Sequence, residues 1–396
     1  MRAIYCVLFT LGLVYGAVAE MREWTNSGGR TVKAELVNIT DDTVTLRPAS
    51  GGEHILQRSD LSAEDQKYLS EQEEVREEVQ EKKPYTVSIS GRKIIVNDAH
   101  YIIRGVCYDP VPKGKTTREF DRLTEDLALM TEAGINTIRV YSPIDDRAVL
   151  DEIHAAGLKV IMGIGFNQGE NFDIWSGSFT NYINAYKDHD AILMWELGNE
   201  YNYHPEWFGG PDGWYHALTN AAQMVHQIDP SRPVATAHGE LPDKNVLSAC
   251  PNIDVWGMNA YRWDHPENLF DEWKAISSKP MYLSETGGDS YMTIEGHGYD
   301  QGENQEAQAD ATKEILDDVF SDLDICSGVT LFSFLDGWWK AGNPDTQDTH
   351  GSAPNSFGVP YDGAPNEEYW GILDIDRNKK LAYEVVKEKY NAVKEK

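Results

Sequence analysis

The sequence has few cysteines, and this shortage restricts what can hold the fold together. Four cysteines occur among 396 residues, and Cys6 lies in an N-terminal apolar stretch that we expect to be removed. The remaining Cys107, Cys250 and Cys326 are an odd number, so at most one disulfide is possible and buried free thiols are expected. No spacing of cysteine and histidine is typical of a zinc site. We therefore predict neither a disulfide framework nor a metal, and no cofactor.

Long hydrophobic runs are also missing. The most apolar stretch runs from Ile4 to Val14, follows Arg2 and ends near Ala17-Val18-Ala19. It is shorter than the roughly 20 residues that a transmembrane helix needs, so a secretory signal explains it better than a membrane anchor. We predict a signal peptide over residues 1–19 with cleavage before Glu20, and a protein that is secreted or periplasmic.

Basic residues are scarce relative to acidic ones. There are 65 Asp and Glu against 35 Lys and Arg, a formal net charge of −30. Such a field repels polyanions, which excludes nucleic acid as a partner and disfavours sulfated or uronate-rich polymers. Neutral substrates fit this composition better.

The glycine-rich nucleotide-binding turn of a doubly wound sheet is absent as well. Short apolar runs of the kind found in parallel sheets instead alternate with helical stretches from residue 85 onward. Eight strands are predicted, over residues 102–108, 137–141, 159–164, 192–197, 234–237, 255–259, 281–284 and 329–334, with helices such as 120–133, 146–156, 214–228 and 305–320 between them. This pattern predicts an α/β fold, a (β/α)8 TIM barrel over residues 85–396. A hairpin formed by residues 85–90 and 93–97 is expected to close the bottom of the barrel.

Residues 20–70 are predicted to form a separate small all-β domain. Residues 31–37 alternate in polarity, residues 43–46 follow as a second strand, and a helix is expected with its cap at Ser62. The stretches 22–25, 29–31 and 60–69 resemble the SH3-like Sla homology domain, a family that binds short peptides in cytoskeletal adaptors. The resemblance implies the fold; the partner of the domain is unknown, and a spacer that packs on the barrel is the alternative. Residues 71–84 are a run of charges without an apolar stripe and are interpreted as a linker.

Two of the predicted strands end on glutamates. Glu200 follows the apolar run 192–197, and Glu285 follows the run 281–284. The carboxyl ends of barrel strands form the active-site face, so these two carboxylates are expected to meet there. A charge placed directly on a buried strand is costly unless it faces a wet site, which favours a functional role. Paired carboxylates are typical of acid/base chemistry at a sugar's anomeric carbon.

The motifs around these glutamates resemble those of glycoside hydrolase clan A. Gly198-Asn199-Glu200, Gly257-Met258-Asn259-Ala260-Tyr261 and Tyr282-Leu283-Ser284-Glu285-Thr286-Gly287 are similar to the clan's fourth, sixth and seventh strand motifs. The spacing of Asn259 and Tyr261 resembles the barrel domain of glycoside hydrolase family 2. Residues 104–108 and 134–142 resemble families seventeen and seventy-two, which act on β-1,3-glucans.

This resemblance implies a role for each matching position. Glu200 is the expected acid/base and Glu285 the expected nucleophile, with Arg139 and Tyr261 donating hydrogen bonds that keep Glu285 ionised. Asn199 is expected to hold the sugar 2-hydroxyl. An apolar floor under the sugar is assigned to Trp338, with Trp339 as its competitor, and four further residues at strand ends are candidates for lining the pocket: Tyr108, Tyr141, His238 and Asn259.

Aromatic residues in the loops suggest a carbohydrate surface. Trp175, Trp207, Trp214 and Trp263 follow the third, fourth and sixth strands, and several exposed aromatic faces on one rim would suit a polymer. The long loop from Gly342 to Gly371 is interpreted as a plain active-site loop, with a lid and a weak calcium site as alternatives.

Several departures from the family patterns restrict the interpretation. No β-sandwich domain is recognisable ahead of the barrel, and Thr286 stands where the transglycosylating family usually has tyrosine. No Asn-x-Lys uronate-binding motif is found in a suitable place, since Asn378-Lys379-Lys380 belongs to the C-terminal helix region. We therefore predict a secreted retaining glycoside hydrolase acting on a neutral β-linked glycan, an oligosaccharide or polysaccharide such as a β-glucan. A β-glucan transglycosylase and a non-catalytic glycan-binding or scaffold protein are the alternatives.

Overall fold

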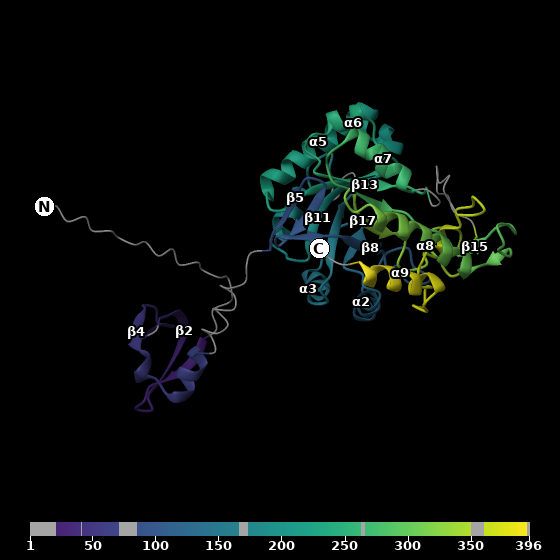
Figure 1. Cartoon of the computed structure of the whole chain (residues 1–396). Helices are drawn as coiled ribbons and strands as arrows, with labels where there is room; N and C mark the ends of the chain where they lie inside the picture. The colour runs from purple at the N-terminus through teal and green to yellow at the C-terminus, as the bar shows by residue number, and fades with distance from the viewer. Residues whose placement is uncertain are drawn as a thin grey trace. The chain divides into compact units, whose positions relative to one another are not determined.

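The computed structural model describes residues 21–40, 42–70, 85–165, 173–262, 266–349 and 360–393. The chain divides into two compact units, Met1–Pro84 and Tyr85–Lys396, and each is described here by itself (Figure 1). The predicted signal peptide, the predicted linker and Trp263 lie outside the described residues.

The N-terminal unit is a four-stranded antiparallel sheet with a short core. Its strands lie in the order β1 (Met21–Thr25), β2 (Thr31–Ile39), β3 (Thr43–Pro48) and β4 (His54–Gln57), followed by the 3-10 turn η1 (Arg58–Asp60). The core collects Trp24, Ala34, Val44, Leu46, Leu61 and Leu69. Residues 63–70 are helical, and Ser62 Oγ accepts a hydrogen bond from the Asp65 amide at 3.2 Å, which confirms the predicted cap. The unit is all-β apart from this helix; its likeness to SH3 domains stays a prediction.

The second unit is a closed barrel of eight parallel strands. They are β8 (Ile103–Cys107), β9 (Thr137–Val140), β10 (Lys159–Ile164), β11 (Ile192–Asn199), β12 (Val234–Gly239), β13 (Val255–Asn259), β14 (Met281–Glu285) and β17 (Cys326–Leu331). Each pairs with the next in parallel, and β17 pairs with β8 to close the ring. The predicted (β/α)8 fold is therefore confirmed.

The last barrel strand differs from its predicted position. We expected residues 329–334, whereas β17 spans Cys326–Leu331. The sequence stays apolar through Phe332, Phe334 and Leu335, so hydrophobicity alone did not mark the strand end. Phe332 is consequently the first residue after the strand, where residues reach the active-site face of a barrel.

A small sheet closes the bottom of the barrel, as predicted. It contains β5 (Val87–Ser90), β6 (Lys93–Val96) and a third strand that the sequence analysis missed, β7 (Ala99–Tyr101). Val87 and Ile94 pack against residues near the amino ends of the barrel strands, including Ile103 and Leu193. With the amino ends covered, the carboxyl ends of the strands, which we call the mouth, form the opposite end.

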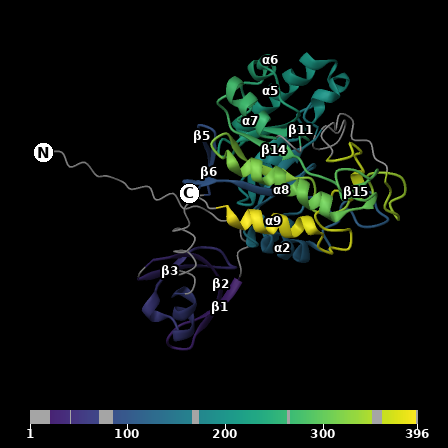
Figure 2. The same ribbon diagram turned by 45° about the vertical axis from the view of Figure 1, so that its right-hand side comes forward.

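Helices cover the outside of the barrel. They are α2 (Leu123–Glu132), α3 (Arg147–Ala155), α4 (Thr180–Tyr186), α5 (Pro211–Ile228), α6 (Lys244–Ala249), α7 (Pro266–Ile276), α8 (Gln305–Ser321) and α9 (Leu381–Ala392). Asp146, Asp243 and Asn304 cap α3, α6 and α8 by accepting hydrogen bonds from first-turn amides. α8 and α9 lie side by side in both ribbon views (Figure 2).

Short elements complete the mouth. They are the 3-10 turns η2 (Tyr201–Tyr203), η3 (Pro205–Phe208) and η4 (Glu367–Tyr369), and the two-residue strands β15 (Tyr291–Met292) and β16 (Gly302–Glu303). η2 and η3 follow β11 directly, so they lie beside the residues at its carboxyl end.

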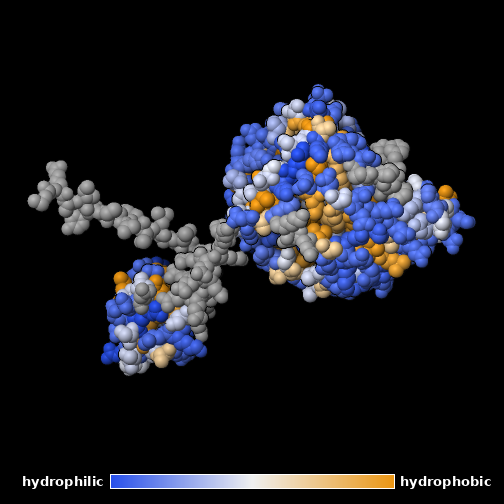
Figure 3. Space-filling view, viewed as in Figure 1, coloured by the Kyte–Doolittle hydropathy of each residue, from blue (hydrophilic) through white to orange (hydrophobic). Residues whose placement is uncertain are grey.

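The interior and the surface agree with the composition. Cys107, Cys250 and Cys326 are buried and free, which confirms the prediction of free thiols. Hydrophilic residues make up most of the visible face of the barrel unit, with apolar residues in smaller groups between them (Figure 3). None of the helices in the described ranges combines the length and the apolarity that a bilayer crossing requires.

Candidate active site

Glu200 and Glu285 stand at the carboxyl ends of two barrel strands. Glu285 is the last residue of β14, and Glu200 comes directly after β11. Gly198 and Glu200 have positive φ angles of 75° and 56°, and this turn leads the chain out of the strand into η2. A Cβ at Gly198 would lie 2.7 Å from the Trp214 ring, so a glycine is required there. The turn brings the Glu200 side chain to the mouth.

Three donors hold the Glu285 carboxylate. Its Oε1 accepts hydrogen bonds from Arg139 Nη1 at 2.8 Å and from Tyr141 Oη at 2.9 Å. Its Oε2 accepts one from Tyr261 Oη at 2.9 Å. The side chain is nearly buried, and donors that point at a carboxylate favour its ionised form. The structure thus brings Arg139, Tyr141 and Tyr261 together on Glu285, as the sequence predicted for two of them and allowed for the third.

Arg139, in β9, is fully buried and connects three acceptors. Besides Glu285, its Nη2 donates to Asn199 Oδ1 at 2.7 Å and its Nε donates to Glu196 Oε1 at 2.7 Å. Glu196 lies inside β11 with 1% exposure and also accepts a hydrogen bond from the Tyr282 hydroxyl. Burial raises the pKa of Glu196, and the Arg139 charge opposes this. Glu196 thus binds Nε of the Arg139 guanidinium, while Nη1 and Nη2 donate to Glu285 and Asn199.

Sequence reasoning missed Glu196. A signal was available, because a carboxylate within the fully apolar run of β11 needs a partner of opposite charge. Arg139 in β9, two strands away in the barrel, supplies this charge, and the sequence analysis had assigned it to Glu285 alone.

Two asparagines connect the strands that carry the glutamates. Asn199 Oδ1 accepts a hydrogen bond from Asn259 Nδ2 at 3.0 Å, and Asn259 Oδ1 accepts one from Ser284 Oγ at 2.7 Å. Together with the bond from Arg139, this fixes the Asn199 carboxamide with its oxygen toward the arginine. Its nitrogen therefore points to the other side and is held in one orientation.

Glu200 experiences a different environment from Glu285. Burial and the negative charge of Glu285 raise the pKa of Glu200 to about 7, although a hydrogen bond with Asn259 and the charges of Arg139 and Lys340 oppose the shift. A carboxyl with this pKa holds its proton near neutral pH. The two glutamates are thus close enough to interact electrostatically.

An aromatic wall adjoins Glu285, and it is not the one that we predicted. The Tyr261 ring meets the Trp370 ring edge to face at 5.2 Å, and Phe332 meets Trp370 at 5.7 Å. Trp338, the predicted floor, is instead packed under Lys113, whose Nζ lies 4.1 Å from the ring centroid. Because β17 ends at Leu331, Phe332 takes the strand-end position that we assigned to Trp338.

Two other predicted pocket residues lie away from the glutamates. The Tyr108 hydroxyl donates to Asp126 at 2.7 Å, in a fully buried layer between β8 and α2. His238 lies between Tyr215, whose hydroxyl is 3.1 Å from Nε2, and the Glu240 carbonyl oxygen, 2.9 Å from Nδ1. Tyr108 follows β8 and His238 lies within β12, and both side chains contact residues of the helical layer.

The structure describes three of the four loop tryptophans and part of the 342–371 loop. Trp214 is buried, whereas Trp175 and Trp207 are exposed. Glu368 in η4 accepts hydrogen bonds from the amides of Ala341 and Asp348, which ties the start of the 342–371 loop to its end; residues 350–359 lie outside the described part. Within the described ranges, no group of three or more His, Cys, Asp or Glu side chains is arranged to hold a metal ion.

Comparison with known proteins agrees with the barrel fold. The family model described as "Glycosyl hydrolases family 2, TIM barrel domain" matches residues 87–310. The β-glucuronidase of Rattus norvegicus is 26% identical in an alignment of 229 residues that covers 52% of this chain and 34% of that protein. A 1,3-beta-glucanosyltransferase of Saccharomyces cerevisiae is 22% identical in an alignment of 251 residues that covers 51% of this chain and 52% of that protein.

Solved structures show the same fold. The β-glucuronidase of Bifidobacterium dentium complexed with coumarin-3-O-glucuronide has a TM-score of 0.62 at 18% identity, covering 94% of this chain and 60% of that one. The GH2 beta-galacturonidase from Eisenbergiella tayi bound to galacturonate has a TM-score of 0.58 at 21% identity, covering 89% of this chain and 58% of that one.

A closed (β/α)8 barrel with two interacting glutamates at its mouth defines a glycosidase of the TIM-barrel class. The chain belongs to glycosyl hydrolase family 2, whose barrel domain it matches over more than half of its length. It spans about a third of the length of the β-glucuronidases that it matches, 34% of the rat enzyme.

Proposed function

We propose that this glycosidase hydrolyses a β-glycoside with retention of the anomeric configuration, with Glu285 as nucleophile and Glu200 as acid/base. The observation that supports the proposal is the contrast between the two carboxylates. Glu285 receives three hydrogen bonds that favour its charged form, whereas burial and the neighbouring charge raise the pKa of Glu200 to about 7. A double displacement requires one ionised carboxyl group, which acts as the nucleophile, and one protonated carboxyl group, which acts as the general acid.

In the first step the Glu285 carboxylate attacks the anomeric carbon and the glycosidic bond breaks. Glu200 donates its proton to the departing oxygen, which leaves as an alcohol, and a glycosyl ester of Glu285 remains. Arg139 and Tyr261 stabilise the free carboxylate before attack and again when it is released.

In the second step Glu200, now ionised, takes a proton from a water molecule whose oxygen attacks the anomeric carbon. The ester bond breaks, Glu285 is released and the sugar leaves with its original configuration. Asn199, fixed by Arg139 and Asn259, is the proposed donor to the 2-hydroxyl of the sugar, a contact that tightens in the transition state. Phe332 and Trp370 provide the apolar wall in place of Trp338.

We further propose that the sugar is neutral. Of the proteins named above, the two β-glucuronidases and the β-galacturonidase act on sugars that carry a carboxylate, whereas the 1,3-beta-glucanosyltransferase does not bear the name of a uronic acid. In this chain Lys340, which lies near Glu200, also interacts with the carboxylates of Glu367 and Asp109. The charge of Lys340 is therefore already shared among three carboxylates and is a poor partner for a uronate. The formal net charge of −30 also repels an anionic substrate.

This function is tested by measuring turnover on a panel of aryl β-glycosides and neutral β-glucans, mannans and galactans. The purified wild-type protein is compared with Glu285→Gln and Glu303→Gln. Glu303 is an exposed glutamate on β16, so its isosteric change is the matched control and should leave the rate unchanged. Glu285→Gln should lose at least roughly 1,000-fold in kcat, because the nucleophile is removed. Proton NMR of the first product should show the β-anomer.

Each alternative predicts a different result. A transglycosylase would release chains longer than the starting material, and faster turnover of β-glucuronides than of neutral glycosides would contradict the neutral substrate. If wild type and Glu285→Gln had the same rate on every substrate, the catalytic assignment would be contradicted. The remaining alternative would then be a non-catalytic glycan-binding protein.

Export is a separate proposal. The apolar stretch Ile4 to Val14 followed by Ala17-Val18-Ala19 supports cleavage before Glu20 and a secreted or periplasmic enzyme. Mass spectrometry of the protein recovered outside the cytoplasm should find Glu20 at its N-terminus; an intact Met1 there would contradict the cleavage.

A further inference from the structure

Two tryptophans at the mouth expose large apolar side chains. Trp175, in the segment after β10, is 56% exposed, and Trp207, in η3, is 46% exposed. Tryptophan is seldom this exposed without a reason, because its burial contributes more than that of most other side chains. Neither residue takes part in the proposed double displacement.

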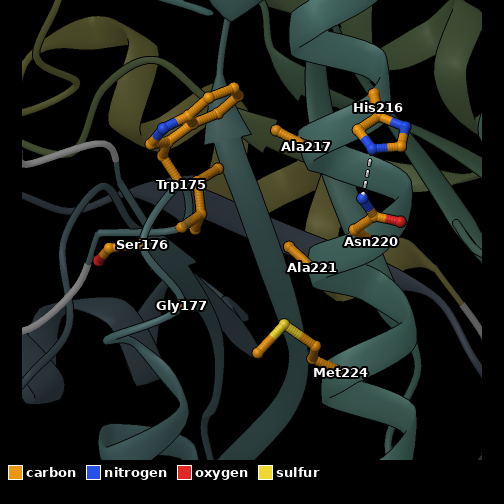
Figure 4. A pocket seen from close by; sticks show the side chains of 9 residues that line it. Trp175, Ser176, Gly177, His216, Ala217, Asn220, Ala221 and Met224 are labelled. Atoms are coloured by element: carbon orange, nitrogen blue, oxygen red, sulfur yellow. Dashed lines mark hydrogen bonds between the residues drawn. The ribbon is translucent and has the colours of Figure 1, made fainter.

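A groove separates Trp175 from α5 (Figure 4). Its volume is about 420 Å³, within the range of small-molecule sites. The small side chains of Ala217 and Ala221 leave room between the helix and the tryptophan, and Met224 lies at one end. On the helix side, His216 and Asn220 are hydrogen bonded to each other at 2.9 Å and both are exposed.

The lining of this groove is uncharged. Its nine residues include no aspartate, glutamate, lysine or arginine, although 25% of the whole chain is charged. Apolar faces with hydroxyl, amide and imidazole groups beside them match the two surfaces of a pyranose ring, which has an apolar face and a rim of hydroxyls. The lining thus offers no carboxylate, ammonium or guanidinium group as a partner for a charged ligand.

Aromatic contacts connect the groove with the candidate active site. The Trp175 ring meets Phe208 at 5.8 Å, and Phe208 meets Tyr201 at 5.8 Å. Tyr201 directly follows Glu200 and also meets the exposed Trp207 at 5.5 Å. The same short segment after β11 therefore carries both the proposed acid/base and Phe208, the buried ring against which Trp175 packs.

We propose that the groove between Trp175 and α5 is a secondary subsite that binds further units of a neutral β-linked oligosaccharide whose reacting sugar occupies the site of Glu200 and Glu285. Trp175 stacks on a sugar face, and Asn220 and His216 bind hydroxyls from the helix side. This inference extends the proposed function from a β-glycosidase to one that recognises an extended chain.

Comparison of a short and a long substrate in the full-length protein tests the subsite. Wild type, Trp175→Ala, Trp175→Phe and Asn220→Ala are assayed on an aryl β-glycoside and on oligosaccharides of two to six units of the same sugar. Ile294→Ala is the matched control, because Ile294 is also 56% exposed but lies outside the groove. Thermal unfolding of each variant establishes that it is folded.

Trp175→Ala should raise KM for chains of four or more units by about 3-fold to 10-fold, the loss expected from one stacking contact. Trp175→Phe should recover part of this loss, Asn220→Ala should weaken the long substrates less, and Ile294→Ala should have no effect. All variants should hydrolyse the aryl glycoside at the wild-type rate. Unchanged KM for every chain length in Trp175→Ala, or an equal loss on the short and long substrates, would overturn the proposal.

Failure of the subsite and failure of the catalytic proposal can be told apart. Binding of the tetrasaccharide to Glu285→Gln, with and without Trp175→Ala, is measured by calorimetry and needs no turnover. Binding that Trp175→Ala weakens supports the subsite even if wild type is inactive on the panel. Equal binding by the two proteins, or no binding to either, refutes the subsite even if the aryl glycoside is hydrolysed.

Discussion

The pH dependence of hydrolysis follows from the environment of Glu200. Burial and the Glu285 charge raise its pKa from 4.5 to about 7, which corresponds to roughly 3 kcal/mol against the ionised form. As general acid, Glu200 must carry a proton when it meets the substrate. We therefore expect kcat/KM to fall as the pH rises through about 7, because the ionised fraction of Glu200 then grows.

The fall of kcat/KM at high pH is the alkaline limb of the pH profile, and a substitution of Lys340 should shift it in an enzyme that is still active. Its positive charge lowers the pKa of Glu200, so Lys340→Met should move the limb to higher pH. A charge–charge interaction across a partly exposed site contributes roughly 0.3 to 1 kcal/mol, which corresponds to a displacement of about 0.2 to 0.7 of a pH unit. Lys313→Met, which removes an exposed lysine of α8 that pairs with Asp317, is the matched control and should leave the limb in place.

Removing the other charge should act in the opposite direction. Glu285→Gln deletes the negative neighbour of Glu200 and should lower the pKa of Glu200. Because this variant is expected to be inactive, the titration is followed by NMR of ¹³C-labelled glutamate carboxyls. A wild-type alkaline limb near pH 4.5, the ordinary value for glutamate, or a Glu200 pKa that does not fall in Glu285→Gln would refute the reasoning.

Three further predictions concern single side chains. Tyr261→Phe removes one of the three donors on Glu285 and should reduce kcat roughly 10-fold to 150-fold, the equivalent of a charge-assisted hydrogen bond, in steady-state kinetics; an unchanged kcat would contradict the role of the hydroxyl. Glu200→Gln should stabilise the fold at pH 8 by on the order of 1 to 3 kcal/mol and have little effect at pH 4, measured by urea unfolding. The sign follows because a carboxyl whose pKa is raised on folding stabilises the protein below the unfolded value of 4.5 and loses that contribution as the pH rises through about 7; equal effects at both pH values would refute it. Tyr108→Phe should cost about 1 kcal/mol of stability through the lost bond to Asp126 and leave kcat/KM unchanged, whereas a fall in kcat/KM without loss of stability would return Tyr108 to the active site.

The strands of the barrel were predictable because each is a short apolar run between polar segments. The predicted ranges 159–164 and 255–259 coincide with β10 and β13. Glu200 and Glu285 stood out for the same reason, since an abrupt change from apolar to acidic residues marks where a buried strand reaches solvent. The order and parallel pairing of the strands then followed from the alternation with helices.

The direction of each side chain was not predictable in this way. Barrel strands are buried on both faces, so an apolar pattern does not distinguish residues that point into the barrel from those that face the helices. Tyr108 and His238 were expected at the pocket and face the helical layer instead. Glu196 was overlooked although it anchors Arg139 inside the barrel.

Contacts between distant segments were beyond the reach of the sequence. Trp370 comes from the far end of the 342–371 loop, yet it packs between Phe332 and Tyr261. Trp338, only a few residues after the last strand, packs against Lys113 instead. Proximity along the chain favoured the wrong tryptophan, because a loop of this length can return to the mouth at any of several points.

Local hydrophobicity and the points where it stops were enough to predict the fold class, seven of the eight strand positions and the two glutamates at strand ends, with β17 as the exception. The third donor to Glu285, the charges that raise the pKa of Glu200 and the aromatic rings of the wall became visible only in the folded chain. Those properties depend on distances between side chains from different strands and on their burial, and both arise only when the barrel closes.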